Sequence, residues 1–535
     1  MRALLKSVLI LVLFCCSDYL LAQSEEGSAP AKIKLLNADQ LLYDAKDIMA
    51  RKLIGNVKFK HQGAIMTCDS AYMFTQENRI NAYSNVEINQ GDTVFLYGDS
   101  LKYSGDTRLA ELRGNIKLID PNQILTTAYL DYDMDQKMAY YLGGGIIETK
   151  DSTSTLSSEI GYYYTKTKLF YFKNNVEVVN PDYTIYSDTL EYASERKKSY
   201  FHGPTTIISD SNTVFCEKGW YDQLKNLAEF TCNAAIISKD QQLRGDSIFY
   251  NQNTGEGEVF RDVDILDTTN SVQIFGDYAR YNETDSTSLV TGSRVELIQF
   301  FDLDSLFLHA DSLYSSYDST RQHREMFAYH KVKFYKSDLQ GKCDSMAFLN
   351  ADSSVFMFED PIIWSKANQM TGDTVQLRTY DGEIEYMKLY EDAFIVSKED
   401  TNKFNQIKGR RLKAFFNDSN DVYRIDVNGN GQTIYYGKEA DSTYMGLNRL
   451  DCSEMKIMLK NNQIDDITFY VSPVGLFEPM SDVSPQNEKL DNFNWFDYLQ
   501  PKSRSDIFIW KKPKEQKPIS AGTNLDTEEV ITFEK

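Results

Sequence analysis

A repeat of about 30 residues runs through most of this 535-residue chain and limits the folds open to it. Most copies open with a small residue and an acid, followed by an apolar residue two positions later and commonly an aromatic residue four positions later. Gly98-Asp99, Leu101 and Tyr103 show the pattern. The other openings are Ala38-Asp39, Cys68-Asp69, Thr127-Ala128, Ser158-Glu159, Ser187-Asp188, Cys216-Glu217, Gly245-Asp246, Gly276-Asp277, Ala310-Asp311, Cys343-Asp344 and Gly372-Asp373, with degenerate copies at Gly409-Arg410 and Cys452-Ser453. Because such arrays grow by adding units, the repeat predicts an elongated, solenoid-like stack of about 14 units.

The spacing within each copy predicts strands. Apolar residues at every second position put one face inside and the other in water, and the abundant Tyr (35) and Phe (30) favour extended structure. A second strand follows a Gly- or Asn-containing turn, as in Gly114-Asn115-Ile116. The acid shares its parity with the apolar positions, so we expect it at an inward-turning corner. Each unit then holds two or three short strands in an all-β fold.

The two ends of the chain differ from the array. Arg2 and Lys6 precede an apolar run, which predicts a cleaved signal peptide over residues 1–22. Lipidation at Cys15 or Cys16 stays open. The array is expected over residues 33–470, and six of the eleven prolines follow it, so residues 471–535 are expected to be a poorly ordered tail.

The charge pattern argues against nucleic acid as a partner, because the net charge is −21 and no long basic cluster interrupts the array. The column of acids invites a comparison with paired catalytic carboxylates, but a residue that recurs in every unit is better explained as a turn-capping group. The five histidines are scattered, and the calcium-like loop from Asp426 lacks its twelfth ligand, since that position is Gly437. We therefore expect no catalytic residues, no metal and no cofactor.

The inner face is the remaining candidate site. It has two interpretations: a dry core filled by its own side chains, or a trough for acyl chains.

The openings such as Ala38-Asp39 to Tyr43, the Gly-Asn-Val turns and the signal peptide resemble the OstA-like family, which includes the lipopolysaccharide-transport protein LptA and the periplasmic domain of LptD. The resemblance implies a β-jellyroll whose apolar interior carries the acyl chains of lipid A. It also implies that the partners are lipopolysaccharide and other jellyroll components of the transport machinery, joined by end-to-end strand pairing. The implied location is the periplasm, with association with the outer membrane left open.

The resulting hypothesis is a non-enzymatic periplasmic carrier or bridge for lipopolysaccharide. The alternatives are a β-helical enzyme acting on polysaccharide, with acids of neighbouring units as the catalytic pair, and a structural β-solenoid at the cell surface. The predicted lipid-binding residues of the inner face are Val57, Phe59, Val86, Ile88, Leu101, Tyr103, Ile116, Leu118, Val176, Val178, Val263, Ile265, Val332 and Phe334.

Overall fold

The computed structural model describes residues 31–43, 50–91, 94–150, 154–380, 383–417, 421–439, 443–460 and 463–512. The predicted signal peptide, residues 1–22, lies outside the described residues. The chain divides into two compact units, unit 1 up to Gly203 and unit 2 from Pro204. Both are built from β-strands, with only two short 3₁₀ helices in the part of the chain that the structure describes, so the predicted all-β class is confirmed.

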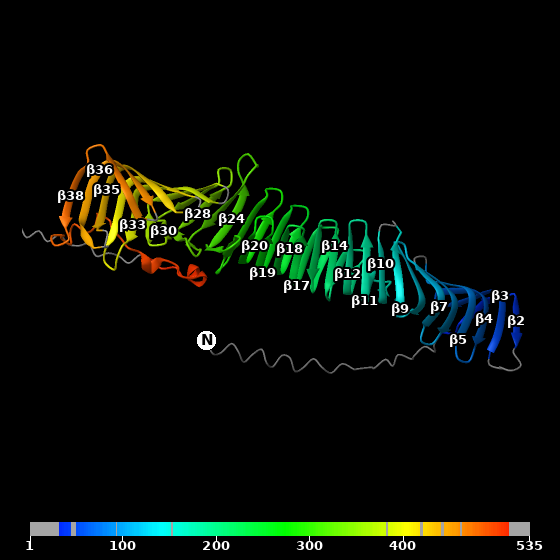
Figure 1. The fold of residues 1–535 in the computed structure, drawn as a ribbon. Coiled ribbons are helices and arrows are strands. Elements are labelled where there is room, and N and C mark those ends of the chain that lie inside the picture. Colours follow the sequence, from blue (N-terminus) through cyan, green and yellow to red (C-terminus); the bar gives the residue numbers. More distant parts are fainter. Residues whose placement is uncertain are drawn as a thin grey trace, which may run out of the picture. The chain divides into compact units, whose positions relative to one another are not determined.

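Unit 1 contains a ladder of antiparallel strands (Figure 1). Each strand from β3 to β12 pairs with the next one in the chain. One repeat therefore holds two long strands rather than two or three short ones. The strands are β1 Lys34–Asn37, β2 Gln40–Tyr43, β3 Ala50–His61, β4 Ala64–Phe74, β5 Arg79–Asn89, β6 Phe95–Ser104, β7 Leu109–Ile119, β8 Gln123–Asp133, β9 Met138–Thr149, β10 Thr155–Tyr164, β11 Leu169–Asn180, β12 Tyr183–Ala193 and β13 Lys198–Phe201.

These strands bend in the middle, where the pairing register shifts. On β5 the bend is a bulge in which Ser84 and Asn85 have φ of 64° and 49°. On β7 Gly114 and Asn115 take the same role, with φ of 77° and 44°. The residues predicted as turns between strands are therefore corners within strands, and each bent strand contributes to two sheets that meet along the line of corners.

The repeated acids secure these corners. Asp69 accepts hydrogen bonds from the side chains of Ser84 and Asn85, both at 2.7 Å, and Asp99 accepts one from Asn115 at 2.8 Å. A Cβ atom on Gly114 would lie 2.4 Å from the Asp99 carboxylate, so the corner needs glycine for its space as well as its φ.

The predicted inward parity of the acid was wrong. Asp99 is exposed, whereas Gly98 and Leu101 on either side of the corner are buried. The alternation of inward and outward side chains shifts by one position on β6 itself, because two residues, Asp99 and Ser100, separate the buried Gly98 and Leu101 at the corner.

Unit 2 continues with antiparallel strands and ends with the two 3₁₀ helices (Figure 1). Its elements are β14 Thr205–Ser209, β15 Asn212–Cys216, β16 Lys218–Asp222, β17 Leu227–Ser238, β18 Gln241–Asn251, β19 Glu256–Asp267, β20 Val272–Asn282, β21 Thr287–Thr291, β22 Glu296–Phe300, β23 Ser305–His309, β24 Ser312–Tyr317, β25 Arg324–Tyr329, β26 Val332–Tyr335, β27 Gln340–Cys343, β28 Ser345–Leu349, β29 Ser354–Phe358, β30 Ile362–Ser365, β31 Asn368–Thr371, β32 Thr374–Tyr380, β33 Glu383–Lys398, β34 Phe404–Phe416, β35 Val422–Lys438, β36 Tyr444–Lys460, β37 Gln463–Tyr470, β38 Val474–Pro479, η1 Asp497–Leu499 and η2 Arg504–Phe508.

Between β21 and β32 the corners interrupt the strands, which separates the two sheets in the pairing pattern. One sheet runs through β21, β24, β25, β28, β29 and β32. The other runs through β22, β23, β26, β27, β30 and β31. Both join the long strand β33. Two sheets that share a line of corners are the stacked, jellyroll-type architecture that the sequence predicted.

Residues 480–512, here called the docked segment, lie against the outer face of the second of these sheets. Leu490 belongs to a buried cluster with Phe394, Val396 and Tyr436, and Leu499 is buried with Trp364. Strand β38 extends the array beyond residue 470. The expectation of a poorly ordered tail therefore does not describe residues 471–512, whereas residues 513–535 lie outside the described part.

Buried glutamines hold the backbone of the docked segment. Gln406 donates from Nε2 to the carbonyl of Glu488 and accepts at Oε1 from the backbone N–H of Leu490. Gln369 makes the same pair of bonds further along, to the Asn494 carbonyl and from the Phe496 N–H. Each side-chain amide thus satisfies one donor and one acceptor that burial would otherwise leave unpaired. Prolines marked this segment as irregular in sequence, but irregular backbone can still be ordered when side chains supply its partners.

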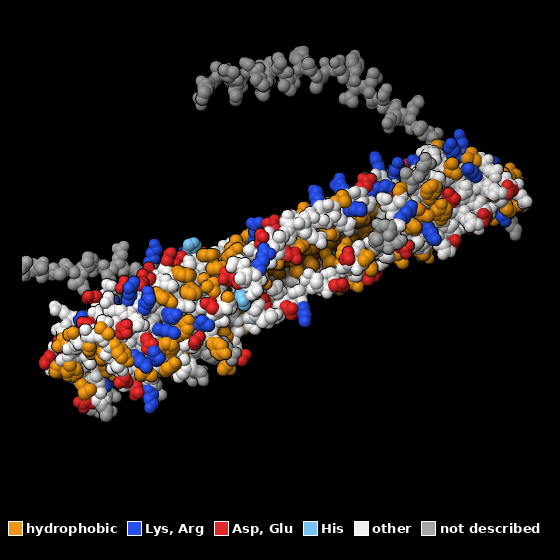
Figure 2. All heavy atoms as spheres, turned by 90° about the horizontal axis from the view of Figure 1, so that it is seen from above, with side chains coloured by type: hydrophobic (Ala, Val, Ile, Leu, Met, Phe, Trp, Pro, Cys, Tyr) orange, Lys and Arg blue, Asp and Glu red, His pale blue; other side chains and the backbone are white. Residues whose placement is uncertain are grey.

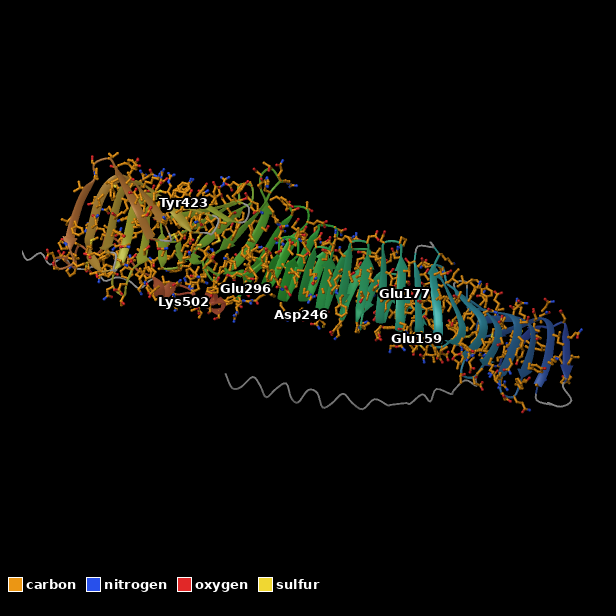
Figure 3. All side chains as sticks on the ribbon, viewed as in Figure 1. Glu159, Glu177, Asp246, Glu296, Tyr423 and Lys502 are labelled. Carbon is orange, nitrogen blue, oxygen red and sulfur yellow. The ribbon has the colours of Figure 1, made fainter. Side chains whose placement is uncertain are left out.

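An ion pair fixes the end of the docked segment. Arg504 on η2 donates two hydrogen bonds to the carboxylate of Glu296, at 2.6 and 2.7 Å. Glu296 lies beside the docked segment (Figure 3). Beside this pair, Lys333 is buried and donates from Nζ to the carbonyls of Asp506 and Ile509.

Candidate functional site

The inner face of the bent strands is the candidate site, and twelve of the fourteen residues predicted there are buried. Ten of the fourteen lie in unit 1: Val57, Phe59, Val86, Ile88, Leu101, Tyr103, Ile116, Leu118 and Val176, all buried, and Val178, which is partly exposed. In unit 2 Val263, Val332 and Phe334 are buried, and Ile265 is partly exposed. The period-two pattern thus identified inward-facing positions correctly on each side of a corner.

In unit 1 the inner face forms a closed core over most of its length. Cross-strand neighbours form a continuous apolar row that runs Phe59, Met66, Ile88, Leu96, Leu118, Leu125, Ile147, Leu156, Val178 and Ile185. Its first five members are almost inaccessible, and the exposed fraction then rises to 9% at Leu156. Large aromatic rings fill the opposite sheet, where Tyr163 and Phe170 stack with centroids 4.0 Å apart. The interpretation as a filled core therefore holds for this part of the protein.

Unit 2 contains a part where the equivalent row is open. Six cross-strand neighbours on β14, β15, β17, β18, β19 and β20 are each partly exposed, although all are apolar and point to the inner face. They are Ile207, Val214, Ile236, Leu243, Ile265 and Ile274, here called the open stretch. Figure 2 shows hydrophobic side chains gathered along a hollow over this part of unit 2.

The open stretch has an end within unit 2. Ile274 pairs with Leu297, which pairs with Leu308, and these two residues are 2% and 1% exposed. Phe334 follows them at 3%. The floor of the open stretch is also apolar, because Ile248 and Val259 of the facing sheet are buried beneath it. The result is an apolar trough, open over six strands and closed beyond them.

Part of the chain is similar to known proteins. Residues 30–188 match the family model described as OstA-like protein. This segment is OstA-like. A solved structure also resembles part of the chain: LptH, the LptA-homologous periplasmic component of the lipopolysaccharide transport device of Pseudomonas aeruginosa. That likeness has 12% identity and a TM-score of 0.22, and covers 26% of this chain and 95% of LptH. No curated protein matches.

The OstA-like segment includes the corner acids from Asp39 to Asp188, and the structure gives the column a structural use. In the same segment Glu159 accepts a hydrogen bond from Asn175 at 2.6 Å. In unit 2 the bond from Asn233 to Glu217 at 2.9 Å repeats this arrangement, and Asp246, at the corner of β18, pairs with Arg261 (Figure 3). A carboxylate that is hydrogen-bonded to a side chain of the neighbouring strand is a poor general acid or base, because those bonds fix its orientation at the corner.

Among the described residues, no group of three or more His, Cys, Asp or Glu side chains is placed to hold a metal ion, and no helix is long and apolar enough to cross a membrane. The five described cysteines are free thiols, and burial raises the pKa of Cys68 to about 11 and that of Cys216 to about 12. These two cysteines act as small buried hydrophobes, as the sequence suggested.

Most of the open stretch was not predicted from the sequence. Of its six members only Ile265 was predicted, because the prediction relied on the Val-polar-Ile pattern that follows each turn. Ile207, Val214 and Leu243 lie on the same cross-strand row, and alignment of the strands about the corner would have placed them there. Exposure could not be inferred in this way, since it depends on how far apart the two sheets lie.

Proposed function

We propose that this protein is a periplasmic carrier or bridge for lipopolysaccharide that holds acyl chains of lipid A in the open stretch of unit 2. The observation that carries the proposal is the row of six partly exposed apolar side chains on one inner face. Such a row is costly to leave in water, and burying one methylene group of an acyl chain contributes about 0.8 kcal/mol. The OstA-like match, and the description of LptH as a transport component, support lipopolysaccharide as the cargo.

The proposed role is non-enzymatic. An apolar trough can transfer a lipid by burying its chains while the sugars stay in water, and this needs no bond to be made or broken. The alternative of a polysaccharide-active enzyme would need acids free to act on a substrate, whereas the corner acids bind side chains of the neighbouring strand. Replacing the corner acids one at a time tests this enzymatic alternative. An enzyme would lose its activity when one particular acid is replaced and keep it when any of the others is replaced.

The partners proposed for this role are other jellyroll proteins that pair strand to strand at its ends. Among the described residues, β1 and β2 pair only with β3, and β37 and β38 pair only with β36. Tyr43 is 74% exposed and Val474 is 70% exposed. Such edges are templates for an added strand.

A photo-crosslinking experiment tests the cargo. A photoreactive amino acid at Ile236 should capture lipid A in the cell envelope, because this position lies in the open stretch. The matched control is Ile237, the next residue, which has the same side chain and is 37% exposed but lies on the outer face. Equal capture at both positions, or capture at neither, would overturn the proposal.

A further inference from the structure

Three tyrosines recur on the inner face of unit 1, at the end of their strands. Tyr103 on β6, Tyr132 on β8 and Tyr163 on β10 occupy the same place in successive repeats. Their exposed fractions are 0%, 1% and 2%. Burial raises the pKa of Tyr103 to about 12 and also raises that of Tyr132 and of Tyr163, so all three keep their hydroxyl protons.

Each of these hydroxyls bonds to a polar side chain 42 or 43 residues earlier. Tyr103 bonds to His61 Nδ1 at 2.7 Å. Tyr132 donates to Gln90 Oε1 at 2.5 Å, and Tyr163 donates to Asp120. The three partners follow the same rule, because His61 ends β3, Gln90 follows the end of β5 and Asp120 follows the end of β7.

These bonds join opposite ends of bent strands. Gln90 and Asp120 lie at the strand ends of one sheet, and the tyrosines lie at the strand ends of the other sheet, on the far side of the corner. A straight strand of ten residues would hold its two ends about 30 Å apart. A hydrogen bond between these two sets of strand ends therefore bridges the opening between the two sheets, here called the mouth. The three bonds close the mouth at intervals of two strands.

Neighbouring groups orient two of the three partners. His61 Nε2 lies 2.8 Å from the carbonyl of Ala31, so it carries the proton and leaves Nδ1 to accept from Tyr103. Lys168 donates to the Asp120 carboxylate at 2.8 Å and to the hydroxyl of Tyr163 at 3.0 Å. Burial alone would raise the pKa of Asp120, but the hydrogen bonds from Lys168 and Tyr163 lower it, which keeps the acceptor ionised.

The corresponding tyrosines of unit 2 do not have this arrangement. Tyr250 on β18 donates to Glu283, which follows β20 at the same edge of the sheet. Tyr281 on β20 is 42% exposed. These two strands belong to the open stretch. The inner face is thus open where a tyrosine bonds to a residue at the strand ends of its own sheet, and closed where the tyrosines bond across the mouth.

We infer that Tyr103, Tyr132 and Tyr163 are latches that decide which part of the inner face admits an acyl chain. With the latches closed, unit 1 excludes the chain and the open stretch of unit 2 holds it. Cargo enters unit 1 only when the cross-mouth hydrogen bonds break. The cargo in this inference rests on the proposed function, whereas the closure of the mouth does not.

The test compares the triple variant Tyr103→Phe, Tyr132→Phe and Tyr163→Phe with a matched control. The control is Tyr140→Phe with Tyr162→Phe, which removes hydroxyls from the opposite face of the same sheet. Hydrogen exchange should become at least tenfold faster in the triple variant at the strand ends near Gln90 and Asp120. The apolar dye N-phenyl-1-naphthylamine should also bind more strongly, while the control should match the wild type in both measurements.

A photoreactive residue at Leu101 then reports on cargo. Lipid A capture there should rise several-fold in the triple variant and stay at the wild-type level in the control. Unchanged exchange and dye binding would overturn the latch. Capture at Ile236 without any gain at Leu101 would overturn the latch while leaving the proposed function intact. Faster exchange and stronger dye binding without lipid A capture at either position would support the closed mouth and overturn the proposed function.

Discussion

Replacing Gln369 by Leu should release the docked segment. Gln369 on β31 is 1% exposed, and its amide donates to the Asn494 carbonyl at 2.8 Å and accepts from the Phe496 N–H at 2.6 Å. Leucine keeps the volume but leaves that carbonyl and N–H buried without partners. An unsatisfied buried group costs about 1 to 3 kcal/mol, so the two together weaken docking by about 2 to 4 kcal/mol once partial rehydration is allowed for.

This loss corresponds to an increase of about 30- to 1000-fold in the undocked population. Limited trypsin digestion measures it, because Lys489, Lys502 and Arg504 lie in the segment. The control is Gln432→Leu, since Gln432 on β35 bonds to Asp451 and not to the segment. If the cleavage rate within the segment were the same in Gln369→Leu and wild-type protein, glutamine pairing would not be what holds the segment.

Three further outcomes follow from the structure. Gly114→Ala should lower the melting temperature by several degrees more than Gly63→Ala: both glycines have positive φ, but only Gly114 would bring a Cβ atom to 2.4 Å from Asp99, and thermal unfolding measures the difference. Because the pKa of Asp120 is lowered on folding, its stabilisation is present above the unfolded pKa of about 3.9 and disappears as the pH falls through the folded value, so Asp120→Asn should flatten the acid side of a pH–stability profile. Burial and, to a smaller extent, nearby lysines lower the pKa of Lys333 to about 8. The free-energy cost of burying its charge therefore applies in full below pH 8 and disappears toward pH 10.5. Trypsin-resistant docking should strengthen over this range, and Lys333→Met should remove this dependence on pH.

The repeat made most of the architecture of unit 1 predictable. Inward positions such as Val86 and Ile88 follow from alternation alone, and the recurrence of Asn after the turn located the corners. The bend itself was not predictable from alternation, because a bulge such as Ser84-Asn85 has the composition of a turn between strands. The acids were therefore placed on the wrong face but given the correct structural role.

The exposure of the inner face and the docking of residues 480–512 depend on contacts that a repeat does not encode. Ile88 and Ile265 carry the same signature, yet one is inaccessible and the other partly exposed, since exposure depends on the separation of the two sheets. Gln369 and Gln406 each lie three residues before the opening glycine of their repeat, Gly372 and Gly409, but nothing in the sequence pairs them with residues about 80 to 130 positions later.

The corner bonds also bear on how the protein folds. Several corner acids and their partners on the next strand are only 15 to 17 residues apart, as in Asp69 with Ser84 and Asp39 with Asn56. Loops of this size close quickly, so each corner can form as soon as its own hairpin has been synthesised, without waiting for the rest of the chain. The bond from Arg504 to Glu296 spans 208 residues and can form only after unit 2 is built. Short-range closure thus gives the array an order of assembly from the N-terminus, and docking of the last segment marks its completion.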